Sequence, residues 1–169
     1  MSIYSVEHWA ADGLSGLESP GLDPVQSWVA PPPPGSAFMT TPQAFVWGGR
    51  GRETRLTLPR ARSAADAAAG RAGQRQARHQ LTVWVMWASD VSISVQDLFP
   101  VLLRTVLDFF RYAELGQTIA DPTDGSTSVL QTVGEDIEWR YGPPVASGDG
   151  LYLYHAAELT VAAVEAWQS

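Results

Sequence analysis

The sequence predicts an α+β fold: a mixed or antiparallel β-sheet with one main helix packed on a face, preceded by an irregular N-terminal arm. Three observations indicate it: long stretches of β-branched and alternating apolar residues, one stretch with apolar residues at helical spacing, and a first segment rich in proline and glycine. A chain of 169 residues has room for one ordinary core and too little for two. We therefore expect an arm over residues 1–45 and one α+β domain over residues 46–169.

The N-terminal arm is expected to be irregular because turn-forming residues recur along it. Four consecutive prolines, Pro31–Pro34, favour an extended conformation, so this run is predicted to act as a stiff spacer. A role as a ligand for an aromatic groove is the less common alternative. Val6, Trp9, Leu14 and Leu17 have loosely helical spacing, which allows one short helix before Pro20.

A small β element is predicted over Gln43–Gly48, with Arg55–Leu58 as its continuation or hairpin partner. Residues 60–78 contain many alanines and arginines but no large apolar side chain. A helix without an apolar stripe is marginal in water, so we expect a flexible excursion there. Eight of the eleven basic residues, all arginines, lie between Arg50 and Arg78; this stretch carries a net charge of +6 and the rest of the chain −13. The molecule is thus predicted to be an acidic body with one basic strip.

The packed body is predicted to start with a strand over His79–Ala88. This strand is apolar on both alternating sets, since Leu81 and Val83 occupy one set while Trp84 and Met86 occupy the other. A helix or a second sheet would cover one apolar face of such a strand. A neighbouring subunit is a natural candidate to cover the other.

A helix is predicted over Asp97–Leu115, with Gly116 ending it. Ser94 and Asp97 resemble a capping box at its start. Its apolar residues form two neighbouring rows, and the resulting wide stripe favours core packing over a cofactor role. The rows contain Leu98, Leu102, Thr105, Phe109 and Tyr112, and Phe99, Leu103, Val106 and Phe110.

Two further strands complete the predicted sheet. Val129–Tyr141 has mostly apolar odd positions and charged even positions near its end, which indicates a half-exposed strand, and Gly134 indicates a bulge. Alternation over Leu151–Trp167 favours a long antiparallel strand paired with Val129–Tyr141. The alanines of Ala156–Ala166 are also compatible with a helix.

The sequence offers little support for an enzyme, and no cofactor or metal is expected. Cysteine is absent and the three histidines are far apart, which disfavours thiol catalysis and a metal site. No serine lies in a nucleophile-elbow motif. Glu135, Asp136 and Glu138 could bind a cation, but a solvated strand face is the commoner explanation. His155 falls on an apolar set, where a core or interface role is commoner than catalysis.

The seven tryptophans exceed ordinary usage for this length, and they indicate subunit contacts. Trp28 and Trp47, for example, lie in segments with little core of their own. Stacking on single-stranded nucleic acid is the alternative, but the arginine-rich stretch Ala61–Arg78 contains no aromatic residue. The predicted subunit interface consists of Trp47, Trp84, Met86, Trp139, Arg71 and Arg75.

From His79 onward, the order of elements resembles the tail terminator proteins of long-tailed, lambda-type bacteriophages. The resemblance covers about 90 residues and rests on element order rather than on a catalytic signature. Family members usually open with a clear amphipathic helix, from which this sequence departs at its front. The resembling pieces are an apolar strand over His79–Val85, the helix over Asp97–Leu115, and strands over Asp136–Tyr141 and Ala157–Ala162.

The resemblance implies a mixed sheet with helices on one face, assembled as a homohexameric ring. In that family the ring caps the finished tail tube, ends tube polymerisation and provides the docking surface for the head connector. The implied partners are further copies of the chain, the tail tube protein, a head-tail connector or stopper protein, and DNA that passes through the lumen without specific binding. The implied location is the virion neck, and the host cytoplasm during assembly. No membrane association is expected, because the apolar runs are too short to cross a bilayer.

An acidic channel wall would keep DNA from sticking, since like charges repel. We therefore predict that some of Glu135, Asp136, Glu138 and Asp149 face the lumen. Two other functions remain open: another neck ring protein, such as a connector or stopper, or a nucleic-acid-binding accessory protein that uses Arg50–Arg78.

Overall fold

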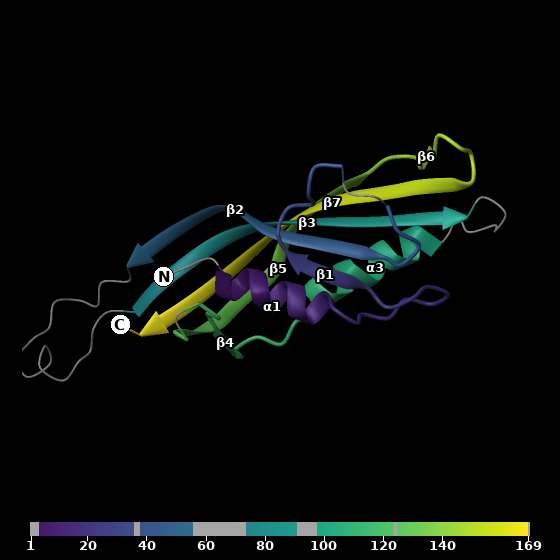
Figure 1. Ribbon diagram of the computed structural model, residues 1–169. Helices are drawn as coiled ribbons and strands as arrows, with labels where there is room; N and C mark the ends of the chain where they lie inside the picture. Colours follow the sequence, from purple (N-terminus) through teal and green to yellow (C-terminus); the bar gives the residue numbers. More distant parts are fainter. Residues whose placement is uncertain (1–3, 36–37, 56–73, 91–97, 124, 169) are drawn as a thin grey trace, which may run out of the picture.

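The computed structural model describes residues 4–35, 38–55, 74–90, 98–123 and 125–168. In these ranges the chain forms two helices and one seven-stranded sheet, which confirms the mixed α+β class (Figure 1). The helices are α1 (Tyr4–Leu14) and α3 (Leu98–Arg111). The strands are β1 (Gln26–Val29), β2 (Gln43–Arg55), β3 (Gln74–Asp90), β4 (Thr118–Ala120), β5 (Thr127–Tyr141), β6 (Val145–Ala146) and β7 (Tyr152–Gln168).

The strands lie in the order β1-β2-β3-β7-β5-β4, and β6 pairs with β7. β1 runs parallel to β2, and every other pair is antiparallel. β3 and β7 pair along their full 17 residues, from Gln74 opposite Gln168 to Asp90 opposite Tyr152. The strand prediction for Leu151–Trp167 and its pairing with β5 are therefore confirmed, because pairing on both sides supplies the backbone hydrogen bonds that a helix would otherwise provide.

Alternate residues of the sheet face a core that both helices cover. Along β3, Leu81, Val83 and Val85 are fully buried. Figure 1 shows α1 and α3 on the same side of the sheet. The apolar stripe of α3 is therefore core packing, as the sequence indicated. Its buried residues are Phe99, Leu102, Leu103, Val106, Leu107 and Phe110.

The main helix is shorter than predicted at its end. α3 ends at Arg111 instead of Leu115, and the predicted capping residues before Leu98 lie outside the described residues. Gly116 has a φ of 81°, and its amide donates to the carbonyl oxygen of Leu130 at 2.8 Å. This glycine therefore shapes the turn between α3 and β4 and does not end the helix.

The prediction of an irregular arm is wrong for residues 4–14, which form α1 and join the core. Val6, Ala10 and Leu14 are fully buried at helical spacing. The stripe is narrow and its residues are small, so tertiary packing rather than propensity stabilises the helix. The possible short helix before Pro20 is thereby confirmed, and β1 adds an edge strand from the same segment.

A close contact joins α1 to α3. Trp9 stacks on Phe109, with ring centroids 5.4 Å apart. Gly13 allows this approach, because a Cβ at that position would lie 2.4 Å from the Phe109 ring.

β2 and β3 are longer than predicted. β2 continues past Gly48 to Arg55, with a bulge between Gly48 and Arg50. β3 begins at Gln74, so residues 74–78 are strand and not part of a flexible excursion; residues 60–73 lie outside the described residues. β3 pairs with β2 on one side and with β7 on the other, so backbone hydrogen bonds hold a stretch that lacks large apolar side chains.

The first half of β5 does not alternate as predicted. Its register against β7 shifts between Leu130 and Thr132. As a result Leu130 is fully buried, whereas Val129 is 38% exposed. The prediction that Val129 belongs to the apolar inner set was therefore wrong.

A second irregularity in β5 confirms the bulge predicted near Gly134. The register shifts again between Val133 and Ile137, and Gly134 has a φ of 73°. A Cβ at Gly134 would lie 2.6 Å from the carbonyl oxygen of Phe110. Glycine is thus required both by the backbone conformation and by the approach of α3.

Candidate assembly surface

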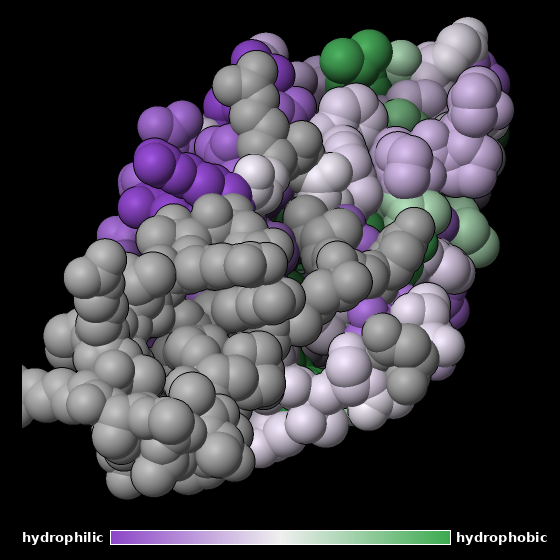
Figure 2. Space-filling view, turned by 90° about the vertical axis from the view of Figure 1, so that its left-hand side faces the viewer, coloured by the Kyte–Doolittle hydropathy of each residue, from purple (hydrophilic) through white to green (hydrophobic). Residues whose placement is uncertain are grey.

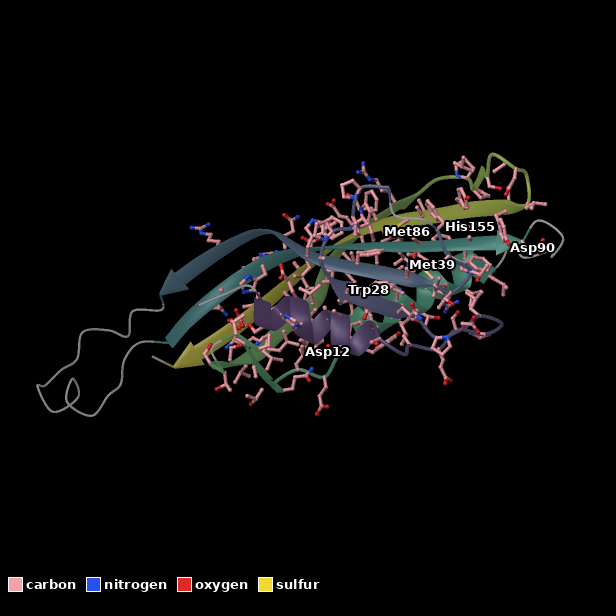
Figure 3. All side chains as sticks on the ribbon, viewed as in Figure 1. Asp12, Trp28, Met39, Met86, Asp90 and His155 are labelled. Atoms are coloured by element: carbon pink, nitrogen blue, oxygen red, sulfur yellow. The ribbon has the colours of Figure 1, made fainter. Side chains whose placement is uncertain are left out.

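One face of the sheet carries neither helix, and we call it the open face. A row of five residues crosses it, each opposite the next on a neighbouring strand. Adjacent strands are about 4.8 Å apart, so the row is about 19 Å long. The first residue of the row, at its aromatic end, is Trp28, which is labelled in Figure 3. The row consists of Trp28 of β1, Phe45 of β2, Trp84 of β3, Glu158 of β7 and Arg140 of β5.

Aromatic rings contact one another in the first half of this row and beside it, where Trp47 lies two residues along β2 from Phe45. Trp28 stacks on Phe45 with ring centroids 5.1 Å apart, and Trp47 meets Trp84 edge-on at 6.1 Å. Trp28 is 40% exposed, and Trp47 and Trp84 are half-buried. Partly exposed aromatic clusters of this kind are typical of surfaces that bury further area against a partner.

Charged groups hold the other half of the row in place. The Trp84 indole nitrogen Nε1 donates to Oε2 of Glu158 at 3.1 Å. Arg140 donates to both carboxylate oxygens of Glu158, at 3.1 and 3.2 Å. Because the carboxylate binds both partners, it fixes the edge of the Trp84 ring, while the Arg140 side chain stays 81% exposed.

A hollow of about 380 Å³ lies on the open face beside the row. Two arginines and two acids line it: Arg52 and Arg78, opposite each other on β2 and β3, and Asp136 and Glu138 of β5. Arg78 approaches Asp136 to 3.8 Å, and the two side chains are 65% and 69% exposed. Exposed pairs of this kind contribute about 0–1 kcal/mol, so a partner can replace the contact at little cost.

The predicted interface residues do not all lie on this face. Trp47 and Trp84 do. Met86 belongs to the same face but is only 4% exposed, so packing within one chain already uses its side chain.

The remaining predicted interface residues lie elsewhere. Trp139 is on the helix-covered side of β5, 49% exposed, with the Arg111 guanidinium 5.9 Å from its ring centroid. Arg75 is a residue of β3 opposite Arg55. Arg71 lies outside the described residues.

Only part of the predicted acidic set comes together. Asp136 and Glu138 line the hollow, and Glu135 is exposed in the adjoining β5 bulge. Asp149 precedes β7, whereas Glu138 is opposite Thr160, eight residues after the first residue of that strand, Tyr152; the two acids are therefore at least about 26 Å apart along the strand direction. These four acids therefore do not form one cluster.

Asp149 stabilises its own turn. Its Oδ1 accepts hydrogen bonds from the Ser147 hydroxyl and from the backbone N–H of Leu151. The Ser147 bond, with the Leu151 bond, lowers the pKa of Asp149 below its ordinary value. Turn formation accounts for these contacts.

His155 is a core residue, as the sequence favoured. It is 7% exposed and stacks between Trp87 and Phe99, with centroids 5.2 Å away on each side. Its Nε2 lies 2.9 Å from the Ser89 hydroxyl, and burial lowers its pKa. Trp87 is 5% exposed and donates to the carbonyl oxygen of Thr40 at 2.7 Å, so it too is satisfied within its own chain.

A buried carboxylate, Glu165, ties α1 to three strands. It is 1% exposed and accepts hydrogen bonds from Nε2 of His79 at 2.7 Å, from Oγ of Ser128 at 2.5 Å and from Oγ of Ser5 at 3.0 Å. Burial alone would raise the pKa of Glu165, but the bonds from His79 and Ser128 and the charge of His79 hold it below the ordinary value. Both serines face the carboxylate and not the imidazole, so these four residues do not form a serine–histidine nucleophile pair.

Sequence reasoning missed Glu165 and the Glu158–Arg140 pair. A signal existed for Glu165, because it continues the apolar odd positions of β7, and a carboxylate on a buried set needs hydrogen-bond donors. The pairing of Glu158 with Arg140 depends on the register between β5 and β7, which the two bulges in β5 set.

No protein-family model matches the chain, and no curated protein matches it either. Among the described residues, no three His, Cys, Asp or Glu side chains lie close enough together to hold a metal ion. In the part of the chain that the structure describes, neither helix is long and apolar enough to span a membrane.

Proposed function

We propose that this chain is a structural subunit of a phage neck, a tail terminator that assembles into a ring on the end of the tail tube. The open face is the observation that supports the proposal most directly. It combines contacting aromatic rings with a carboxylate–guanidinium pair, and neither of the two described helices, α1 and α3, covers it. Interfaces concentrate their binding energy in this kind of aromatic and arginine surface.

The apolar area left in water supports assembly. Tyr141 and Val145 are 50% and 66% exposed. A second hollow of about 420 Å³ opens beside the row, and its lining includes Trp84, Arg140 and Ala156 of the open face. Filling it with side chains of a neighbour would bury apolar surface at about 25 cal/mol per Å².

A ring needs two different surfaces that complement each other on successive copies. The open face and the helix-covered side of one chain differ in composition, so a contact between them would be head-to-tail and can close into a ring. Exposed Glu135, which lies in the β5 bulge and does not line the hollow, is proposed to face the lumen in this ring, where its charge would repel the DNA phosphates.

Addition of the protein to growing tail tubes tests the function. We expect the wild-type chain to stop tube growth at a fixed length and to form a ring at the tube end in electron micrographs. Tubes of unchanged length with bare ends would contradict the proposal. A ring that binds the isolated head connector but not the tube would assign the chain to the connector or stopper class instead.

Two variants test the open face. Trp28→Gln, on that face, is expected to weaken self-association about tenfold or more, because the Trp28 ring, 40% exposed in the single chain, would no longer be buried against a neighbouring copy. Leu151→Gln is the control: this apolar side chain is 59% exposed but lies in the turn before β7, outside the row and outside both hollows of the open face. Equal losses in the two variants, measured by analytical ultracentrifugation, would show that the open face is not the contact surface.

A further inference from the structure

A groove of about 690 Å³ runs between α1 and the end of α3, on the helix side of the molecule. Aromatic residues form part of its lining: Trp9 and Phe109 are half-buried and Tyr112 is 82% exposed. Two exposed acids, Asp12 of α1 and Glu114 just after α3, lie on the same lining. Asp12 is labelled in Figure 3.

The acids that line this groove differ in whether they already form an ion pair. Asp108 is already paired with Arg104 and Arg111 of its own helix. Asp12 and Glu114 have no ion pair with any described residue. Carboxylates next to aromatic faces are the surroundings that a guanidinium group prefers, because it binds carboxylates through two hydrogen bonds and stacks on rings. The groove therefore fits an arginine-bearing segment.

The chain itself carries such a segment, the β2–β3 arm, which we define as residues 50–55 and 74–78. Its sequence contains five arginines and one acid, a net charge of +4. The arginines with described side chains, Arg52 and Arg78, lie opposite each other and are both exposed. Both ends of the arm reach beyond α1 (Figure 1), and described residues at that end of the molecule include a strongly hydrophilic patch (Figure 2).

We propose that the groove of one copy binds the β2–β3 arm of the next copy, with Arg52 and Arg78 meeting Asp12 and Glu114. This inference rests on the proposed ring and names its second surface. The arm is continuous with the open face, since Arg52 and Arg78 line the hollow on that face. The groove lies on the helix side, so the two surfaces differ, as a head-to-tail contact requires.

Charge reversal of each surface tests the contact. The groove variant carries Asp12→Arg and Glu114→Arg, and the arm variant carries Arg52→Glu and Arg78→Glu. Each variant alone would place like charges together, and we expect its self-association to weaken about 100-fold. The control, Glu18→Arg with Asp23→Arg, reverses two exposed acids outside the groove and is expected to associate like the wild type.

Mixing the two variants is the decisive step. In the mixture, the reversed groove of one variant faces the reversed arm of the other, while the native groove faces the native arm. We therefore expect alternating rings with the wild-type mass, measured by mass photometry with the full-length chains. Association of the wild type should also weaken as salt rises, because these charges are exposed.

Three results would overturn the inference: single variants that associate like the wild type, a mixture that does not assemble, or a groove variant that assembles normally but no longer binds the tail tube. The last result would identify the tube protein as the occupant. Circular dichroism checks that each variant folds. If the arm variant does not fold, the double variant Arg52→Gln with Arg78→Gln replaces it, and we expect this variant to weaken self-association about tenfold.

The failure of this inference and that of the proposed function are distinguishable. If the wild type forms rings on tail tubes, but the charge variants do so equally well, the neck function stands and the groove contact is wrong. If the wild-type chain forms no ring with or without tubes, the proposed function itself is wrong.

Discussion

Removal of the Glu165 carboxylate should destabilise the fold strongly and loosen α1. In Glu165→Ala, the donors on His79, Ser5 and Ser128 lose their acceptor. Water cannot easily replace it, because the Glu165 site is buried, with 1% of the residue exposed. Each buried donor without a partner costs about 1–3 kcal/mol, and breaking a buried charged contact costs about 3–5 kcal/mol. We expect a loss of about 4 kcal/mol in the free energy of unfolding, which for a chain of this size lowers Tm by roughly 8–16 °C.

Urea unfolding followed by circular dichroism measures this loss. Glu158→Ala is the matched control on the same strand, because the Glu158 side chain is 31% exposed and its pair with Arg140 should contribute less than about 1 kcal/mol. Hydrogen exchange should also accelerate in α1, which Ser5 joins to Glu165. A Glu165→Ala protein within about 1 kcal/mol of the wild type would refute the role assigned to this carboxylate.

The same carboxylate predicts a dependence on pH. The pKa of Glu165 is lower in the folded protein than in the unfolded chain, where it is about 4.3. Its contribution to stability is therefore fully present above pH 4.3 and is lost as the pH falls through the folded pKa. The difference in stability between the wild type and Glu165→Gln should shrink over this acid range; a constant difference down to pH 2 would contradict the assignment.

Three further substitutions follow from the packing. Gly134→Ala should lower the free energy of unfolding by about 2–4 kcal/mol, since φ is 73° and the Cβ would lie 2.6 Å from an α3 carbonyl oxygen. Gly142→Ala is its control and should be nearly neutral in the same urea titration, because the space around Gly142 is open. Gly13→Ala should displace the Phe109 ring, cost about 1–3 kcal/mol and reduce the near-UV circular dichroism; an unchanged spectrum would contradict the packing. Trp139→Ala should cost less than about 1 kcal/mol, because a half-exposed cation–π contact contributes little, and a larger loss would indicate a core role.

The long elements were predictable because their apolar spacing is strong. The two rows of α3 and the alternation of β7 identify both elements from the sequence, and the pairing of β7 with β5 follows from their patterns. α1 was only partly predictable, since its stripe consists of Val6, Ala10, Ala11 and Leu14, and alanine contributes little to an apolar pattern.

The arm and the open face were less predictable, for reasons of backbone pairing. Glycines at positions 48 and 49 indicate the end of a strand. β2 nevertheless continues beyond a bulge at these glycines, because its pairing with β3 supplies the backbone hydrogen bonds. Likewise, the face on which each β5 residue lies depends on two bulges, of which only Gly134 left a signal. The row from Trp28 to Arg140 exists only because five strands pair in the observed register. No local sequence pattern determines that register.

The mass of the purified chain, with and without tail tubes, tests the central claim most directly. Mass photometry should give a closed ring near six subunits of 18.3 kDa, about 110 kDa, either in solution or on tube ends. A chain that stays at 18.3 kDa at all concentrations and leaves tube ends bare would contradict the account.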